Sequence, residues 1–148
     1  MSDVVTIIVD GPPVGKGRPR FVRATGRVYT PAETEGYENC IRLTGRVAMK
    51  GRPLLLGPLE VGVVALVAIP QSWSANKRRH AELGVVRPTS RPDGDNFLKI
   101  ALDALNGTCW RDDAQVTDIT LRKRYSAHPA LQIFVREITA SELMATAA

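Results

Sequence analysis

Four stretches of the chain are rich in apolar and β-branched residues, the pattern that predicts strands. Residues 4–9 (VVTIIV) form the first, and residues 59–69 (LEVGVVALVAI) are apolar enough for a central strand buried on both faces. Residues 115–125 and 131–138 follow late in the chain, with the short break His128-Pro129-Ala130 between them. This spacing predicts that the last two strands pair as an antiparallel hairpin.

Apolar residues at helical spacing predict helices over residues 30–49 and 96–105. Ser72-Trp73-Ser74 opens a further short helix with a polar, basic middle, to about residue 83, and the tail from Ser141 resembles a short helix. The first helix opens on a capping box, in which Thr30 caps, Pro31 fits the first helical position and Glu33 bonds back. Asn106-Gly107 stops the third helix. Between the first strand and the first helix, residues 18–29 (RPRFVRATGRVY) predict a small hairpin within a long loop.

The order of these elements predicts an α+β or mixed α/β layer fold, with helices packed on one small mixed sheet. At 148 residues the length fits one domain. We assign residues 1–138 to that domain and expect residues 139–148 to be a tail whose helix frays at its end.

Cysteine usage and the chain start indicate the compartment. Cys40 and Cys109 lie far apart without a metal-ligand spacing, so we interpret them as free thiols in a reducing cytoplasm. The start, MSDVVTIIVDG, has no positive segment before its apolar stretch, which argues against a signal peptide. No apolar run is long enough to cross a membrane.

Positive charge is concentrated in three clusters. The net charge is +5 and the pI is about 9.6, a weak indication of nucleic acid by itself. The clusters are Lys16, Arg18, Arg20, Arg23 and Arg27; Lys77, Arg78, Arg79 and His80; and Arg122, Lys123 and Arg124. One cluster alone is most simply a solvated face. Three around an acidic centre favour binding of a phosphate backbone.

That acidic centre frames the predicted helix 96–105, with Asp93 and Asp95 before it and the pair Asp112-Asp113 after it. Clustered carboxylates repel one another unless a cation offsets their charge. Mg²⁺ prefers one or two carboxylates with water and a substrate phosphate, and Mn²⁺ suits the same oxygen ligands. Taken singly, each aspartate also fits a helix cap or a turn. Sequence spacing alone does not bring the two groups together.

Lys99 follows Asp95 by four residues and so shares its helix face. It is either an exposed ion-pair partner of Asp95 or Asp103, or a cation that faces a scissile phosphate. We take Asp103 as a partner within the helix and not as a metal ligand. Neither His80 nor His128 has a ligand partner at a useful spacing.

These residues resemble the RusA family of Holliday-junction resolvases. The match rests on Pro92-Asp93-Gly94-Asp95-Asn96, Lys99, Leu102-Asp103-Ala104-Leu105-Asn106-Gly107 and Trp110-Arg111-Asp112-Asp113-Ala114-Gln115-Val116. The segment from Gly11 to Phe21, with Tyr29-Thr30-Pro31, also looks like a branch of that family. The resemblance extends to about residue 138.

The resemblance implies a RusA-like, homodimeric, Mg²⁺-dependent endonuclease that acts on branched DNA, without an organic cofactor or a membrane. In the family, the two acids of D-x-D and the second acid of D-D supply the metal site. Here these are Asp93, Asp95 and Asp113, and the family lysine falls on Lys99. Asp112 is carried over only as a neighbour.

The chemistry fits these residues independently. Carboxylate-held Mg²⁺ makes a water nucleophilic and neutralises the leaving oxygen, while Lys99 would stabilise charge on the phosphate. Basic residues would hold the DNA strands mainly through phosphates. We expect this role for Lys16, Arg18, Arg20, Arg23, Lys77, Arg78 and Arg79.

The expected function is therefore resolution of Holliday junctions by paired symmetric cuts, in DNA recombination and repair. A two-fold dimer would supply the two sites that such cuts require. Three alternatives stay open: a nuclease for flaps, forks or simple duplex, a structure-selective DNA-binding protein that does not cut, and a metal-free structural protein with capped helices.

Overall fold

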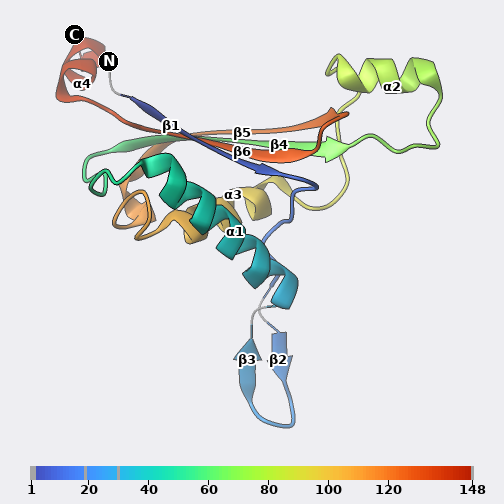
Figure 1. The fold of residues 1–148 in the computed structure, drawn as a ribbon, viewed down its shortest axis with the longest axis horizontal. Coiled ribbons are helices and arrows are strands. Elements are labelled where there is room, and N and C mark those ends of the chain that lie inside the picture. The colour runs from blue at the N-terminus through green and yellow to red at the C-terminus, as the bar shows by residue number, and fades with distance from the viewer. Residues whose placement is uncertain (1–2, 19, 30, 148) are drawn as a thin grey trace.

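The computed structural model describes residues 3–18, 20–29 and 31–147, with the side chains of Arg20 and Tyr29 outside that description. Its main sheet has the strand order β1-β6-β4-β5 (Figure 1). The strands are β1 (Val4–Asp10), β4 (Leu59–Ala68), β5 (Val116–Ser126) and β6 (Ala130–Glu137). β5 runs parallel to β4, and the other pairs are antiparallel, so the sheet is mixed as predicted.

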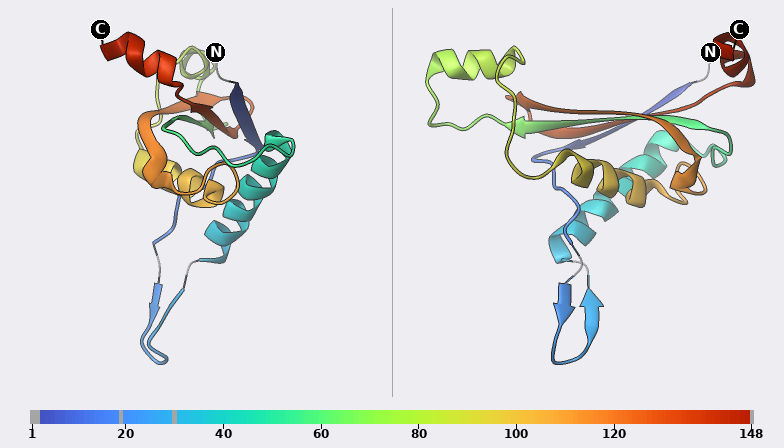
Figure 2. Two further views of the ribbon diagram at one scale, coloured as in Figure 1. Left: turned by 90° about the vertical axis from the view of Figure 1, so that its left-hand side faces the viewer. Right: turned by 180° about the vertical axis from the view of Figure 1, so that it is seen from behind.

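Two helices cover one face of this sheet, and the remaining elements lie at its margins (Figures 1 and 2). The helices are α1 (Ala32–Met49), α2 (Ala75–Glu82), α3 (Gly94–Leu105) and α4 (Ala140–Ala147). α1 and α3 pack on the covered face, whereas α2 and α4 lie at opposite ends of the sheet. The predicted hairpin forms from β2 (Arg20–Val22) and β3 (Arg27–Tyr29) and projects away from the body (Figure 2). The α+β fold is confirmed.

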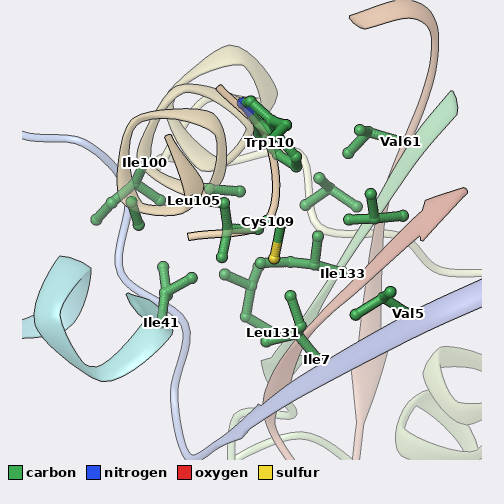
Figure 3. Close-up of a cluster of buried hydrophobic side chains, with 14 of the residues drawn as sticks. Val5, Ile7, Ile41, Val61, Ile100, Leu105, Cys109, Trp110, Leu131 and Ile133 are labelled. Carbon is green, nitrogen blue, oxygen red and sulfur yellow. The ribbon is translucent and has the colours of Figure 1, made fainter. Parts of the chain in front are cut away.

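The core lies between the covered face of the sheet and the helices α1 and α3 (Figure 3). Ile133 of β6, Ile41 of α1 and Ile100 of α3 are fully buried there, together with Trp110 from the turn after α3. Gly45 lets the helices approach closely, because a Cβ at that position would lie 2.7 Å from Cδ2 of Leu105. The core therefore fixes where α3 begins and ends relative to the sheet.

The prediction that the strand 59–69 is buried on both faces is wrong. Val61 and Val63 of β4 are buried toward the helices, but Glu60 is exposed and Val64 is only half-buried on the opposite face. Alternating burial arises because α1 and α3 lie on the same face of the sheet.

The predicted hairpin of the last two strands is also wrong, because β4 lies between them. Val63 pairs with Leu121 of β5 on one side and with Ile133 of β6 on the other. β6 has buried residues at alternate positions and takes an interior place. β5 carries Arg122 and Arg124, and charged side chains suit an edge strand.

The starts of α1, α2 and α3 differ from prediction, and α2 begins at Ala75, three residues later than expected. Pro31 is the N-cap of α1 and not its first helical residue, and the predicted cap Thr30 lies outside the described residues. α3 begins at Gly94, two residues early, which places Asp93 at the N-cap and Asp95 in the first turn. The tail helix forms as α4. Among the described helices, none combines the length and apolarity needed to span a membrane.

Candidate active site

A pocket of 310 Å³ opens at the N-terminal end of α3. The loop after β1 packs closely there, because a Cβ on Gly15 would lie only 2.7 Å from Cβ of Pro92. The backbone N–H of Lys16 donates to the carbonyl of Asn96 at 2.9 Å. The pocket is lined by Lys16, Arg18, Arg91, Pro92, Asp93 and Asn96. Two segments far apart in the sequence thus build one site.

Asp93 occupies the N-cap position of α3, yet its side chain makes no capping hydrogen bond. Asp93 and Asp95 are exposed and form no ion pair with any other described residue. Their carboxylate oxygens are therefore available for a ligand. The oxygens of a capping carboxylate would instead accept hydrogen bonds from the helix backbone. Arg18 and Arg91 line the same pocket as Asp93. A carboxylate that suits a cation and guanidinium groups that suit a phosphate thus line one pocket.

Lys99 is exposed on α3 and makes no ion pair within the described ranges. The ion pair with Asp95 or Asp103, one of its two predicted roles, is not formed. Asp103 instead accepts an ion pair from Lys16, with Nζ 3.2 Å from Oδ2. The ammonium of Lys99 is accordingly free to meet a ligand.

Lys16 has two carboxylate partners, Glu38 of α1 and Asp103 of α3. Its side chain is only 15% exposed. Burial would lower the pKa of Lys16, but the bonds to Glu38 and Asp103 outweigh it and hold the pKa above its ordinary 10.5. Lys16 therefore holds three elements together next to the pocket that it lines.

Asp113 lies in a short 3₁₀ turn (Asp113–Gln115) at the other end of α3. Burial is the largest cause that raises the pKa of Asp113. Asp112 raises this pKa further through a hydrogen bond and through its charge, and the charge of Asp103 adds to the rise. A hydrogen bond with Asn106 acts in the opposite direction. Asp113 thus sits in a second acidic cluster, whose mutual repulsion a bound cation would relieve.

Gln115 holds the turn that carries Asp112 and Asp113. Its Oε1 accepts hydrogen bonds from the backbone N–H groups of Arg111 at 2.9 Å and Asp112 at 3.0 Å. Its Nε2 donates to the carbonyls of Leu55 and Gly57, at 2.9 and 3.1 Å. The sequence placed Gln115 in the D-D-x-Q-V pattern but gave it no role.

The two acidic groups are separated along α3. The helix has 12 residues and is therefore about 18 Å long. Asp93 and Asp95 lie at its start, and Asp113 lies near Asp103 and Asn106 toward its end. Within residues 3–18, 20–29 and 31–147, no three Asp, Glu, His or Cys side chains gather closely enough to hold a metal ion. A single chain does not bring all three predicted ligands together.

The predicted DNA-binding residues occupy three places. Arg18 lines the pocket, while Arg23 is exposed in the turn of the β2–β3 hairpin. The side chain of Arg20 lies outside the described part. Arg27 and the exposed Phe21 lie on paired strands of the hairpin, which thus presents a cation and an aromatic ring to solvent.

The second predicted basic group lies on α2. Lys77 places its Nζ 3.9 Å from the ring centroid of Trp73, and Arg78 donates to the carbonyls of Pro70 and Gln71. Arg79 is exposed. Arg91 and Asn96 of the pocket were missed as site residues, although they flank the predicted aspartates in the sequence.

The pocket thus places the uncapped carboxylate of Asp93 beside the guanidinium groups of Arg18 and Arg91. A family model described as Endodeoxyribonuclease RusA matches residues 10–136. The chain belongs to this family, and its activity class is that of an endodeoxyribonuclease. It is also 36% identical over 144 residues to the uncharacterized protein YqaN of Bacillus subtilis (strain 168), covering 93% of this chain and 99% of YqaN.

Proposed function

We propose that the protein is a Mg²⁺-dependent Holliday-junction endonuclease that acts as a homodimer in DNA recombination and repair, in the cytoplasm where DNA is found. The observation that carries this proposal is the uncapped carboxylate of Asp93 in one pocket with Arg18 and Arg91. If Asp93 were only a helix cap, its carboxylate would accept a hydrogen bond from the backbone of α3. A groove that only binds DNA would have no carboxylate at this position, because a carboxylate repels phosphate.

Each residue has a distinct task in the proposed reaction. Asp93, Asp95 and Asp113 would hold the metal ion, and Mn²⁺ would suit the same oxygens. The chemistry that Mg²⁺ would supply there is activation of a water and neutralisation of charge on the leaving oxygen. Arg18 and Arg91 fix the scissile phosphate, because a guanidinium can donate two parallel bonds to it. Lys99 stabilises the negative charge that builds on that phosphate.

Dimerisation has a physical role in this proposal. Asp93 and Asp113 are separated by the length of α3, so one chain leaves each carboxylate group incomplete. Two copies whose α3 helices run antiparallel across a two-fold axis would place Asp93 and Asp95 beside the partner's Asp113. The same axis provides two equivalent sites, which paired cuts in a four-way junction require.

The proposed catalytic unit is residues 1–138, with the tail 139–148 outside it. α4 contacts the sheet through the ion pair of Glu142 with Arg136 of β6. It lies at the end of the sheet opposite to α2 (Figure 1). We expect a chain ending at residue 138 to keep its cutting activity.

The test is cleavage of a synthetic four-way junction beside a matched linear duplex, each with Mg²⁺ and with EDTA. Paired, metal-dependent nicks in the junction alone are the expected result. Equal cutting of the junction and the duplex would instead indicate a nuclease without junction preference. Binding to the junction without cutting would assign the protein a recognition role.

A further inference from the structure

Three arginines gather at the edge of the sheet, at the end near α2. Arg122 and Arg124 are two residues apart on β5, opposite Val64 and Leu66 of β4, so both point to one face. Lys123 points to the other face, where its Nζ donates to the carbonyl of Ser90 at 2.7 Å. The basic run of the sequence is thus divided between two faces.

The bond from Lys123 to Ser90 fastens the loop between α2 and α3 against β5. This loop carries the third arginine, Arg87, whose Nε donates to the carbonyl of Gly84 at 2.9 Å. The side chain of Arg124 is held against the backbone of β5, because its Nη1 donates to the carbonyl of Lys123 at 2.9 Å. Arg122 is exposed and makes no such bond with the described residues.

Arg122 and Arg124 share one face of β5, and the loop that carries Arg87 is bonded to the same strand through Lys123, so the three arginines lie on adjoining segments. None forms an ion pair with any carboxylate in the described part of the chain. The pKa of Arg124 is lowered, first by partial loss of solvent and then by the charges of Arg87 and Arg122. Like charges held together cost free energy, and an anion between them would remove that cost.

We propose that Arg87, Arg122 and Arg124 form a binding site for the phosphate backbone of DNA, outside the pocket at Asp93. The identity of the ligand rests on the proposed function. Arg87 is four residues from Arg91 of the pocket, so the two lie within about 14 Å of one another along the chain. A single DNA arm can therefore contact the pocket and continue over the arginines.

Arginines at an edge strand also have a structural explanation, because charge there prevents pairing with another sheet. That explanation applies to Arg122 and Arg124 on β5 but not to Arg87, which comes from a loop held in place by Lys123. Edge protection requires charge alone. A phosphate site requires several donors close together, and here β5 supplies two arginines on one face while the loop bonded to β5 supplies a third.

The test compares two variants that each lose two positive charges. Arg122→Gln/Arg124→Gln removes most of the site. Arg46→Gln/Arg52→Gln is the matched control, since neither side chain bonds to another described residue. This control lies at or just after the end of α1, at the opposite end of the sheet from α2 (Figure 1).

Binding of a fluorescent four-way junction is measured in EDTA, across a range of salt concentrations. The slope of log affinity against log salt falls by about 0.9 for each lost phosphate contact, so we expect a fall of about 2 for the site variant and none for the control. Arg122→Gln alone should lower it by about 1. Because EDTA prevents metal-dependent cutting, this result is independent of whether the protein is a nuclease.

Equal slopes for the site variant and the control would overturn the phosphate site.

Thermal unfolding at low salt separates binding from folding. Because Arg122→Gln removes repulsion and no bond, we expect it to leave the melting temperature unchanged or raised. A lowered melting temperature with an unchanged slope would assign the cluster a structural role instead. Absence of Mg²⁺-dependent cutting by the unmodified chain, with the slopes as expected, would disprove the nuclease proposal and leave this site in place.

Discussion

Nζ of Lys16 lies 3.2 Å from Oδ2 of Asp103 and also contacts the carboxylate of Glu38. One ammonium therefore joins the N-terminal loop to α1 and α3. It also neutralises Asp103, whose charge acts on Asp113. The sequence predicted Lys16 as a DNA contact, but in the structure its charge is already balanced by two carboxylates.

We expect Lys16→Met to lower the free energy of unfolding by about 2 kcal/mol, since charged hydrogen bonds of this kind contribute about 1.5–3 kcal/mol. The loss leaves Glu38, whose side chain is only 14% exposed, without its cation. Urea unfolding of Lys16→Met, Glu38→Gln and the double variant measures the coupling between the two residues. Strictly additive effects would contradict the structural role of Lys16.

The proposed metal ligands predict a separation of cutting from binding. Asp93→Asn or Asp113→Asn should abolish cutting of a four-way junction, while binding survives or becomes tighter because one repulsive charge is lost. Asp118→Asn is the matched control, since Asp118 is exposed on β5 and bonds to Thr117. Retained cutting in either Asp93→Asn or Asp113→Asn would remove that residue from the site.

The proposed dimer predicts that two inactive variants restore each other. If Asp93 of one subunit works with the partner's Asp113, a mixed dimer of Asp93→Asn and Asp113→Asn contains one site with both aspartates intact. Unfolding and refolding the two variants together should therefore restore single nicks, while each variant alone stays inactive. A mixture that remains inactive, although mixed dimers form, would place all ligands of a site within one chain.

Sequence patterns predicted the elements better than their pairing. The apolar runs gave every strand of the main sheet, and helical spacing gave α1 and α3 to within about two residues of their observed bounds. The pairing of β5 with β6 was wrong, because nothing local shows that β4 enters between them from far earlier in the chain. Edge placement could have been inferred from the charges of Arg122 and Arg124.

The sequence predicted which aspartates lie at the start of α3, but not which distant residues line the pocket beside them. The clustering of Asp93 with Asp95 follows from their spacing at a helix start. The approach of Arg18 to Asp93 depends on Gly15, where only a residue without a side chain lets the loop lie against Pro92. Such contacts between distant segments follow from packing, so a linear pattern does not encode them.

Glu142 predicts a pH dependence of stability at the C-terminal end. Its pKa is held below the ordinary 4.5, first by hydrogen bonds from Thr139 and then by Arg136. A carboxyl group with a lowered pKa stabilises the folded state above its unfolded pKa, and that contribution is lost as the pH falls through the folded value. The melting temperatures of the unmodified chain and Glu142→Gln should therefore differ at pH 7 and converge below pH 4.5. A constant difference at all pH values would contradict this assignment.

The last prediction concerns Gln115, whose hydrogen bonds hold the turn that carries the proposed metal ligand Asp113. Gln115 is not itself a proposed ligand. Its amide holds the turn through two accepted and two donated hydrogen bonds. In Gln115→Glu, the carboxylate still accepts from Arg111 and Asp112 but no longer donates to the carbonyls of Leu55 and Gly57. It also adds a charge beside Asp112.

We expect Gln115→Glu to raise the Mg²⁺ concentration needed for half-maximal cutting by about 10-fold or more, since partners that orient metal ligands typically contribute 10–100-fold. Cutting at saturating Mg²⁺ should largely recover, because the ligands themselves remain. Gln71→Glu, on an exposed residue, makes the same chemical change as a control. If Gln115→Glu lowered only the melting temperature and left the Mg²⁺ dependence equal to that of Gln71→Glu, the residue would serve folding and not the metal site.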